Sequence, residues 1–126
     1  MAVKYILSEK GNPLKPAEPK KWYASSKSTG SIELKALGKD ITQRSTVNHA
    51  DTLAVLEALT QVLTSRLAEG QIVRFGDFGS FQVSVGSEGA ESEDKFHGSM
   101  IKTKKVTFRP GPDLKEMLNN LKFEKM

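Results

Sequence analysis

Cysteine is absent from the 126 residues, which excludes disulfide bonds and thiolate metal sites. No apolar run approaches the roughly 18 residues that a membrane-spanning helix needs. The first ten residues hold no long apolar run followed by a small-residue cleavage site, so no signal peptide is indicated. These absences favour a soluble, cytoplasmic protein without a membrane partner.

Excess charge is also scarce. The formal net charge is +4 and the pI is about 9.3, which permits a polyanionic partner without requiring one. Residues 1–30, here called the leader, hold six lysines and two glutamates and so match the whole excess. The leader lysines fit either a solvated edge that discourages sheet aggregation or a contact with nucleic acid.

Catalytic and metal-binding patterns are missing as well. No spacing typical of a catalytic triad joins the two histidines, His49 and His97, to a serine. The acids Glu91, Glu93 and Asp94 lack the spacing of a calcium-binding loop. We therefore expect no enzymatic activity, no cofactor, no metal and no small-molecule substrate.

Helical periodicity dominates the first half of the chain after the leader. Leu34, Leu37 and Ile41 form one apolar stripe of a helix that ends near Arg44. Asn48 is a suitable N-cap for a second helix that ends before Gly70, where a left-handed residue is needed. The second helix is apolar on more than one face, which predicts two partners, one of them an identical subunit.

Strand patterns follow over Ile72–Phe75, Phe81–Val85 and Ile101–Phe108. The segment between the last two strands, about residues 86–104, reads as an arm. A short helix over Asp113–Leu121 comes next, and residues 122–126 form a tail. In the leader, two runs near residues 3–7 and 20–24 predict a hairpin or a pair of edge strands.

Two motifs in this order resemble the bacterial HU/integration host factor family. The first runs from Glu69-Gly70-x-x-Val73 through Phe78-Gly79-Ser80-Phe81, and the second is the run Phe108-Arg109-Pro110-Gly111-Pro112-Asp113-Leu114-Lys115. The resemblance covers roughly residues 31–121. The leader and the tail resemble the longer HU-related subgroup of Bacteroides-like bacteria.

The resemblance implies an α+β, HU-like fold in an intertwined homodimer. It has two N-terminal helices, a three-stranded antiparallel sheet with a β-arm, and a short C-terminal helix, here with extra N-terminal strands. Residues 1–30 would be the extension and residues 31–126 the DNA-binding domain. We expect the dimer interface to include Leu53, Leu56, Leu59, Leu63, Phe78 and Phe81.

The function implied is sequence-independent binding of double-stranded DNA by a nucleoid-associated protein that holds the duplex and can bend it. In an extended strand Lys102 and Lys104 share one face, and Lys105 and Arg109 share the other. Either of these faces can be the one that meets DNA. The expected DNA-binding residues are Arg74, Lys95, Lys102, Lys104, Lys105 and Arg109.

The arm departs from the family pattern, in which a proline at the arm tip wedges between base pairs. This chain has no proline between Phe81 and Arg109, and the tip of its arm is acidic. Phe96, Met100 or Ile101 could act as wedges or could be packing residues. The alternative function is an HU-fold structural or protein-interaction module with weak or lost DNA binding.

Overall fold

The computed structural model describes residues 1–126, which divide into two units. The central unit comprises residues 34–116, and the terminal unit comprises residues 1–33 and 117–126. No helix has both the length and the apolar character that a membrane span requires.

Two helices open the central unit, α1 (Leu34–Arg44) and α2 (His49–Ala68). The Asn48 side chain caps α2, because its Oδ1 accepts a hydrogen bond from the Asp51 backbone N–H at 2.9 Å. Gly70 follows the helix with φ of 85°, and its N–H donates to the Leu67 carbonyl at 3.0 Å. The predicted start and end of the second helix are confirmed.

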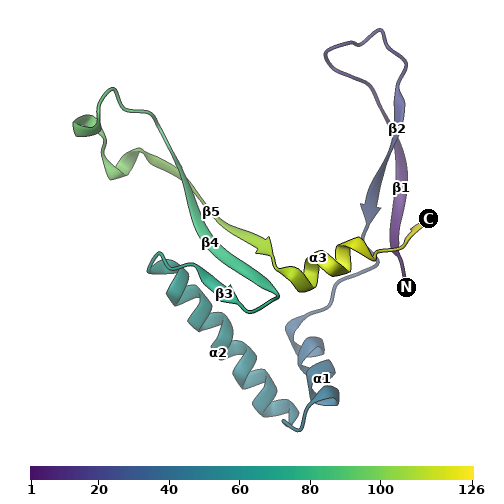
Figure 1. Ribbon diagram of the computed structural model, residues 1–126, viewed down its shortest axis with the longest axis vertical. Helices are drawn as coiled ribbons and strands as arrows, with labels where there is room; N and C mark the ends of the chain where they lie inside the picture. Colours follow the sequence, from purple (N-terminus) through teal and green to yellow (C-terminus); the bar gives the residue numbers. More distant parts are fainter. The chain divides into compact units, whose positions relative to one another are not determined.

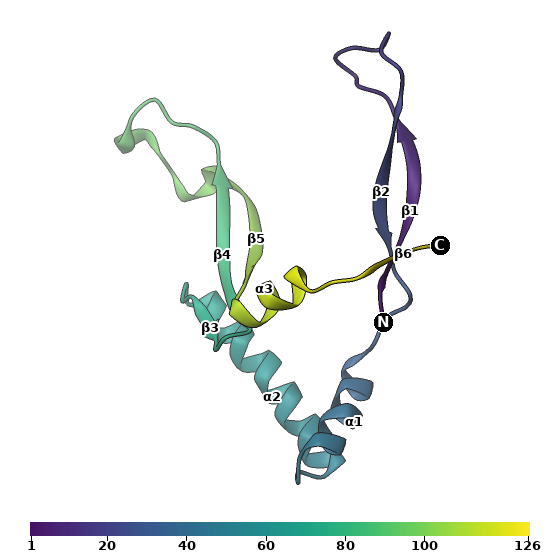
Figure 2. The ribbon, with the colours of Figure 1, turned by 45° about the vertical axis from the view of Figure 1, so that its right-hand side comes forward.

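The central sheet contains β3 (Val73–Phe75), β4 (Gly79–Ser87) and β5 (Ile101–Pro110) in the order β3-β4-β5, all antiparallel. In Figures 1 and 2, α2 runs alongside this sheet, and it contacts β3 and β4. The three predicted strands are confirmed, and each extends beyond or stops short of its predicted range by a few residues. Strands β4 and β5 run on past β3 as a long hairpin.

The arm loop, residues 88–100, closes the far end of this hairpin (Figure 1). Two short 3₁₀ turns shape it, η1 (Glu93–Lys95) and η2 (Gly98–Met100). The Glu88 N–H donates to the Met100 carbonyl at 2.9 Å and so holds the base of the loop. A register shift between Gly86 and Ser87 interrupts the regular pairing there.

Helix α3 (Pro112–Asn119) follows β5 directly, with Pro112 as its first residue as expected, and ends two residues before the predicted Leu121. Two backbone hydrogen bonds tie the start of α3 to the turn between β3 and β4. The Gly111 N–H donates to the Phe78 carbonyl at 2.8 Å, and the Asp113 N–H donates to the Asp77 carbonyl at 3.1 Å. This junction fixes the start of α3 against the turn.

The terminal unit contains a sheet of its own, built from β1 (Val3–Lys10), β2 (Lys21–Lys27) and β6 (Phe123–Lys125) in the order β2-β1-β6. Strands β1 and β2 form an antiparallel hairpin, longer than the sequence predicts. Strand β6 pairs parallel to β1, so residues 122–126, expected as a tail, include a third strand. Residues from both ends of the sequence therefore complete one sheet.

Apolar packing within the single chain is sparse, and no apolar side chain is fully buried. An aromatic cluster joins phenylalanines of the central unit, with ring centroids 4.8 Å apart for Phe81 and Phe108 and 5.7 Å apart for Phe78 and Phe108. Even here Phe78 remains 44% exposed. The central unit thus leaves much of its apolar surface open.

Candidate nucleic-acid interface

One face of the central sheet gathers three of the expected cationic residues. The strand register sets Ser80 opposite both Arg74 and Arg109, and Ser84 opposite Lys105. Because directly paired residues point to the same side of a sheet, these side chains share one face. We call it the basic face.

The remaining strand positions on the basic face are small or carry neutral polar groups. They are Gln82, Gly86, Thr103 and Thr107, and the Ser84 and Thr107 hydroxyls lie 3.1 Å apart. No strand residue on this face is acidic, and none of its three cations forms an ion pair. The face therefore presents uncompensated positive charge beside hydrogen-bonding hydroxyl groups.

A hollow of about 300 Å³ lies at the end of the basic face where α3 begins. Arg74, Ser80 and Arg109 line it together with Lys115, which enters from the first turns of α3. Lys115 was not among the site residues expected from the sequence. The signal available was Pro112 as the first helical residue, which sets Lys115 near the helix start, where the Gly111 junction holds it beside the sheet.

The other three expected cations lie elsewhere. Lys104 pairs with Val85 on the opposite, apolar face of the sheet. Lys102 lies beside the register shift, with its Nζ 3.9 Å from a Glu88 carboxylate oxygen. Lys95 belongs to the arm loop, where its Nζ lies 2.9 Å from Glu91. The predicted set is thus divided among the basic face, the apolar face and the arm.

The arm loop itself is acidic. Residues 88–100 contain one lysine and four acids, Glu88, Glu91, Glu93 and Asp94. The single lysine is already paired with Glu91. Negative charge on this loop opposes contact with a polyanion, whereas the basic face favours it.

A family model describing an HU domain fused to a wHTH, Ig or glycine-rich motif matches residues 1–125. The chain belongs to this family. The resemblance found in the two motifs is therefore confirmed, and so is the α+β class with three helices, while the second three-stranded sheet adds a strand that was not expected.

Among solved structures, the structure of this HU-family chain is similar to that of an inferred bacterial DNA-binding protein from Bacteroides vulgatus ATCC 8482. The TM-score is 0.67 at 13% sequence identity, which shows a common fold. The match covers 99% of this chain and 48% of the other, so the chain spans about half the length of that protein. No curated protein matches the sequence.

The expected dimer-interface residues of this HU-family chain already make contacts within the chain, so they are only partly available to a second subunit. Leu53 and Leu56 lie beside Gly38 of α1, and Leu59 and Leu63 are half-buried. Phe78 and Phe81 belong to the aromatic cluster.

A different strip of α2 carries the most exposed apolar side chains. Val55 is 64% exposed and Val62 is 54% exposed. Seven residues apart on a helix, they lie on the same side, about two turns from each other. Both were absent from the expected interface set, although the apolar breadth of the helix pointed to them.

The HU-family chain shows no group of three or more side chains placed to hold a metal ion. His49 is the first residue of α2 and His97 lies in the arm loop, while Ser80 and Ser84 belong to β4. The chemistry of the site is that of charge and hydrogen bonding, centred on the basic face.

Proposed function

We propose that this HU-family chain binds double-stranded DNA through the basic face and contacts the phosphate backbone without sequence preference. The observation that supports it is the set of four cations free of ion pairs, Arg74, Lys105, Arg109 and Lys115, around the face and its hollow. We further propose that the protein acts by binding rather than catalysis, in the bacterial cytoplasm, on the nucleoid.

The residue types on the face support phosphate contact rather than base reading. Arginine, lysine, serine and threonine are common donors to phosphate oxygens, and such contacts carry no sequence information. The acidic arm loop supports a contact made by the body of the sheet rather than by the arm. We therefore leave Lys95, Lys102 and Lys104 out of the proposed contact.

We also propose that the chain acts as a homodimer. The single chain exposes 10,789 Å², whereas two separate globules of the two unit sizes expose about 8,000 Å². The excess of roughly 3,000 Å² is larger than the area of about 1,000–2,500 Å² that each partner buries in an obligate dimer. The strip with Val55 and Val62 supports a second α2 as part of the covering surface.

The experiment that tests DNA binding is a titration of a random-sequence duplex at several salt concentrations. Lys105→Gln combined with Arg109→Gln removes two charges from the basic face, and Lys104→Gln is the control on the opposite face of the same strand. We expect the slope of log affinity against log salt to fall by about one for each lost phosphate contact. The control should leave the slope unchanged.

Two results would contradict the proposal. An equal loss for Lys104→Gln would show that net charge, not the basic face, governs binding. No binding by the unaltered protein at low salt would show that the family fold is present without this activity. For the dimer, light scattering should give about 28 kDa, twice the chain mass of 13.9 kDa, and a folded monomer at micromolar concentration would refute it.

A second candidate function rests on the acidic arm loop. Its exposed carboxylates and its ordered 3₁₀ turns suit contact with a basic protein surface. In that case the chain is an HU-fold interaction module, and duplex DNA would bind weakly or not at all in the titration above.

A further inference from the structure

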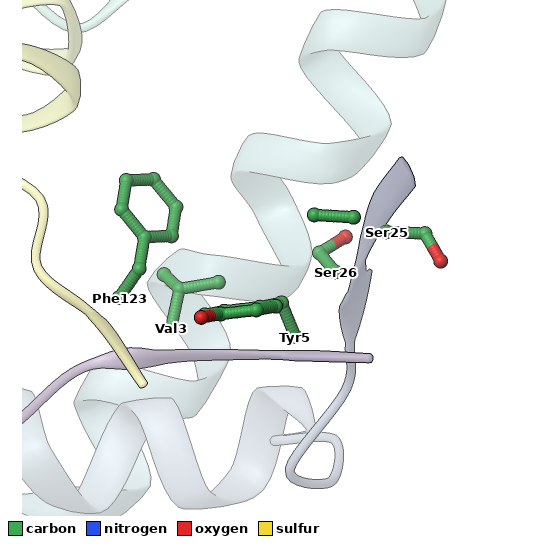
Figure 3. Close-up of a pocket in the computed structure, with 6 residues that line it drawn as sticks. Val3, Tyr5, Ser25, Ser26 and Phe123 are labelled. Atoms are coloured by element: carbon green, nitrogen blue, oxygen red, sulfur yellow. The ribbon is translucent and has the colours of Figure 1, made fainter. Parts of the chain in front are cut away.

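The terminal sheet has two faces of different chemistry. Val3, Tyr5 and Phe123 rise from the same side of the strands in Figure 3, while Ser25 points away from them. The first three line a hollow of about 450 Å³. The opposite face, here called the lysine face, carries the alternate residues of the three strands, which are Lys4, Ile6, Ser8, Lys10, Lys21, Tyr23, Ser25, Lys27 and Glu124.

Lysines on this face are opposed to each other across the hairpin. The register pairs Lys4 with Lys27 and Lys10 with Lys21. Like charges directly opposite each other destabilise an antiparallel pair. Only Lys4 has an acidic partner, with its Nζ 2.7 Å from a Glu124 carboxylate oxygen.

Three lysines of the face, Lys10, Lys21 and Lys27, are therefore exposed without an ion pair. An ordinary solvated face intersperses charges of both signs. Here four lysines share the face with a single acid, Glu124, so the hairpin has a surface that an external polyanion would stabilise. The charge arrangement thus argues for a bound partner rather than for solubility alone.

The spacing of the two lysine pairs suits a duplex backbone. The pairs lie six residues apart on β1, which is about 20 Å along a strand. Duplex DNA carries one charge for about every 1.7 Å of its axis, so several phosphates fall within that length. Between the pairs stand the hydroxyl groups of Ser8, Tyr23 and Ser25, which are donors to phosphate oxygens.

We infer that the lysine face is a second DNA-backbone contact surface, distinct from the basic face of the central sheet. The inference rests on the proposed function only in taking duplex DNA as the polyanion. It assigns to the leader a role in binding that adds to the contact of the central unit, again without base recognition.

The test compares two double variants in the full-length protein. Lys21→Gln with Lys27→Gln removes one lysine from each opposed pair. Lys15→Gln with Lys125→Gln is the matched control, because Lys15 lies in the loop and pairs with Glu18. Lys125 pairs with Tyr5 on the other face of the sheet.

We expect the test variant to lower the salt slope by about two for each lysine face engaged, which is about a 60-fold loss of affinity per face at 0.1 M salt. The control should match the unaltered protein. The emission of Trp22, the only tryptophan, reports on β2 and should stay the same in both variants, because removing like charges does not unfold the hairpin.

Several outcomes would overturn the inference. If the unaltered protein binds and both variants keep its slope, the lysine face makes no contact while the proposed function stands. If both variants lose affinity equally, the effect is one of net charge. If the test variant changes the oligomeric state and not the slope, its partner is the acidic arm of another copy. If the unaltered protein does not bind DNA, both proposals fail.

Discussion

The junction between β5 and α3 allows a sharp test of the packing that positions the hollow. A Cβ added at Gly111 would lie 2.8 Å from the Asp77 carbonyl carbon and 3.0 Å from the Gly79 nitrogen, with the Asp77 carbonyl oxygen closest of all. These are backbone atoms, so no side-chain rotation can relieve the collision. In the Gly111→Ala variant, the turn between β3 and β4 must therefore move away from the start of α3.

That movement weakens the two backbone hydrogen bonds that Gly111 and Asp113 donate across the junction. Losing both costs about 1–3 kcal/mol, since a typical intramolecular hydrogen bond contributes about 0.5–1.5 kcal/mol. Overpacking adds about 1–3 kcal/mol. We expect Gly111→Ala to lower the free energy of unfolding by about 3 kcal/mol.

The assay is urea unfolding, monitored by the far-ultraviolet circular dichroism signal of the helices. One protein concentration is used throughout, because the proposed dimer makes stability concentration-dependent. Gly89→Ala is the control. An added Cβ there meets no atom within 4 Å, and Gly89 is not among the glycines of positive φ. It should stay within about 0.5 kcal/mol of the unaltered protein. A Gly111→Ala protein as stable as the control would refute the close approach.

Three further predictions follow from single features. Asn48→Ala removes the cap oxygen of α2 and should cost about 1 kcal/mol in the same unfolding assay. No loss would mean that the cap is replaced by water. Val62→Asp should convert the dimer to a monomer in light scattering, because it buries a carboxylate in the proposed interface. Leu14→Asp, at a 90% exposed loop position, should leave the dimer intact. Glu93→Gln with Asp94→Asn should raise affinity for duplex DNA severalfold at low salt; an unchanged affinity would mean that the arm loop lies far from the duplex.

Local sequence patterns were sufficient to predict most of the helices and strands, because the ends and faces of these elements depend on residues close together in the sequence. The cap at Asn48 and the left-handed Gly70 mark the ends of α2 in the sequence itself. The alternation of Val106 and Phe108 with Thr107 and Arg109 likewise fixed the two faces of β5. Strand β6 was missed because three residues carry no period, and their extended form comes from pairing with β1.

Less of the candidate site could be predicted from the sequence, because the site depends on pairing between distant segments. Alternation along β5 showed that Lys104 and Lys105 lie on opposite faces of the strand. It did not show which of them lies beside polar neighbours, since that depends on the register with β4. The shift at Gly86 and Ser87 then takes Lys102 out of the regular pairing. Lys115 joins the hollow only through a backbone junction between segments that are more than 30 residues apart, which no local pattern reveals.

The pairing of β1 with β6 has a consequence for the order of folding during synthesis. The end of β1 and the start of β6 are separated by 112 residues, from residue 11 to residue 122. At ribosomal speeds of about 5–20 residues per second, the β1–β2 hairpin waits roughly 5–20 s for its third strand. An isolated two-stranded hairpin is at best marginally stable, and its open edge can pair with other nascent chains. Strands β1 and β2 are made before the central unit but belong to a sheet that is completed only after that unit, so the hairpin is most prone to misassociation before residue 125 is free.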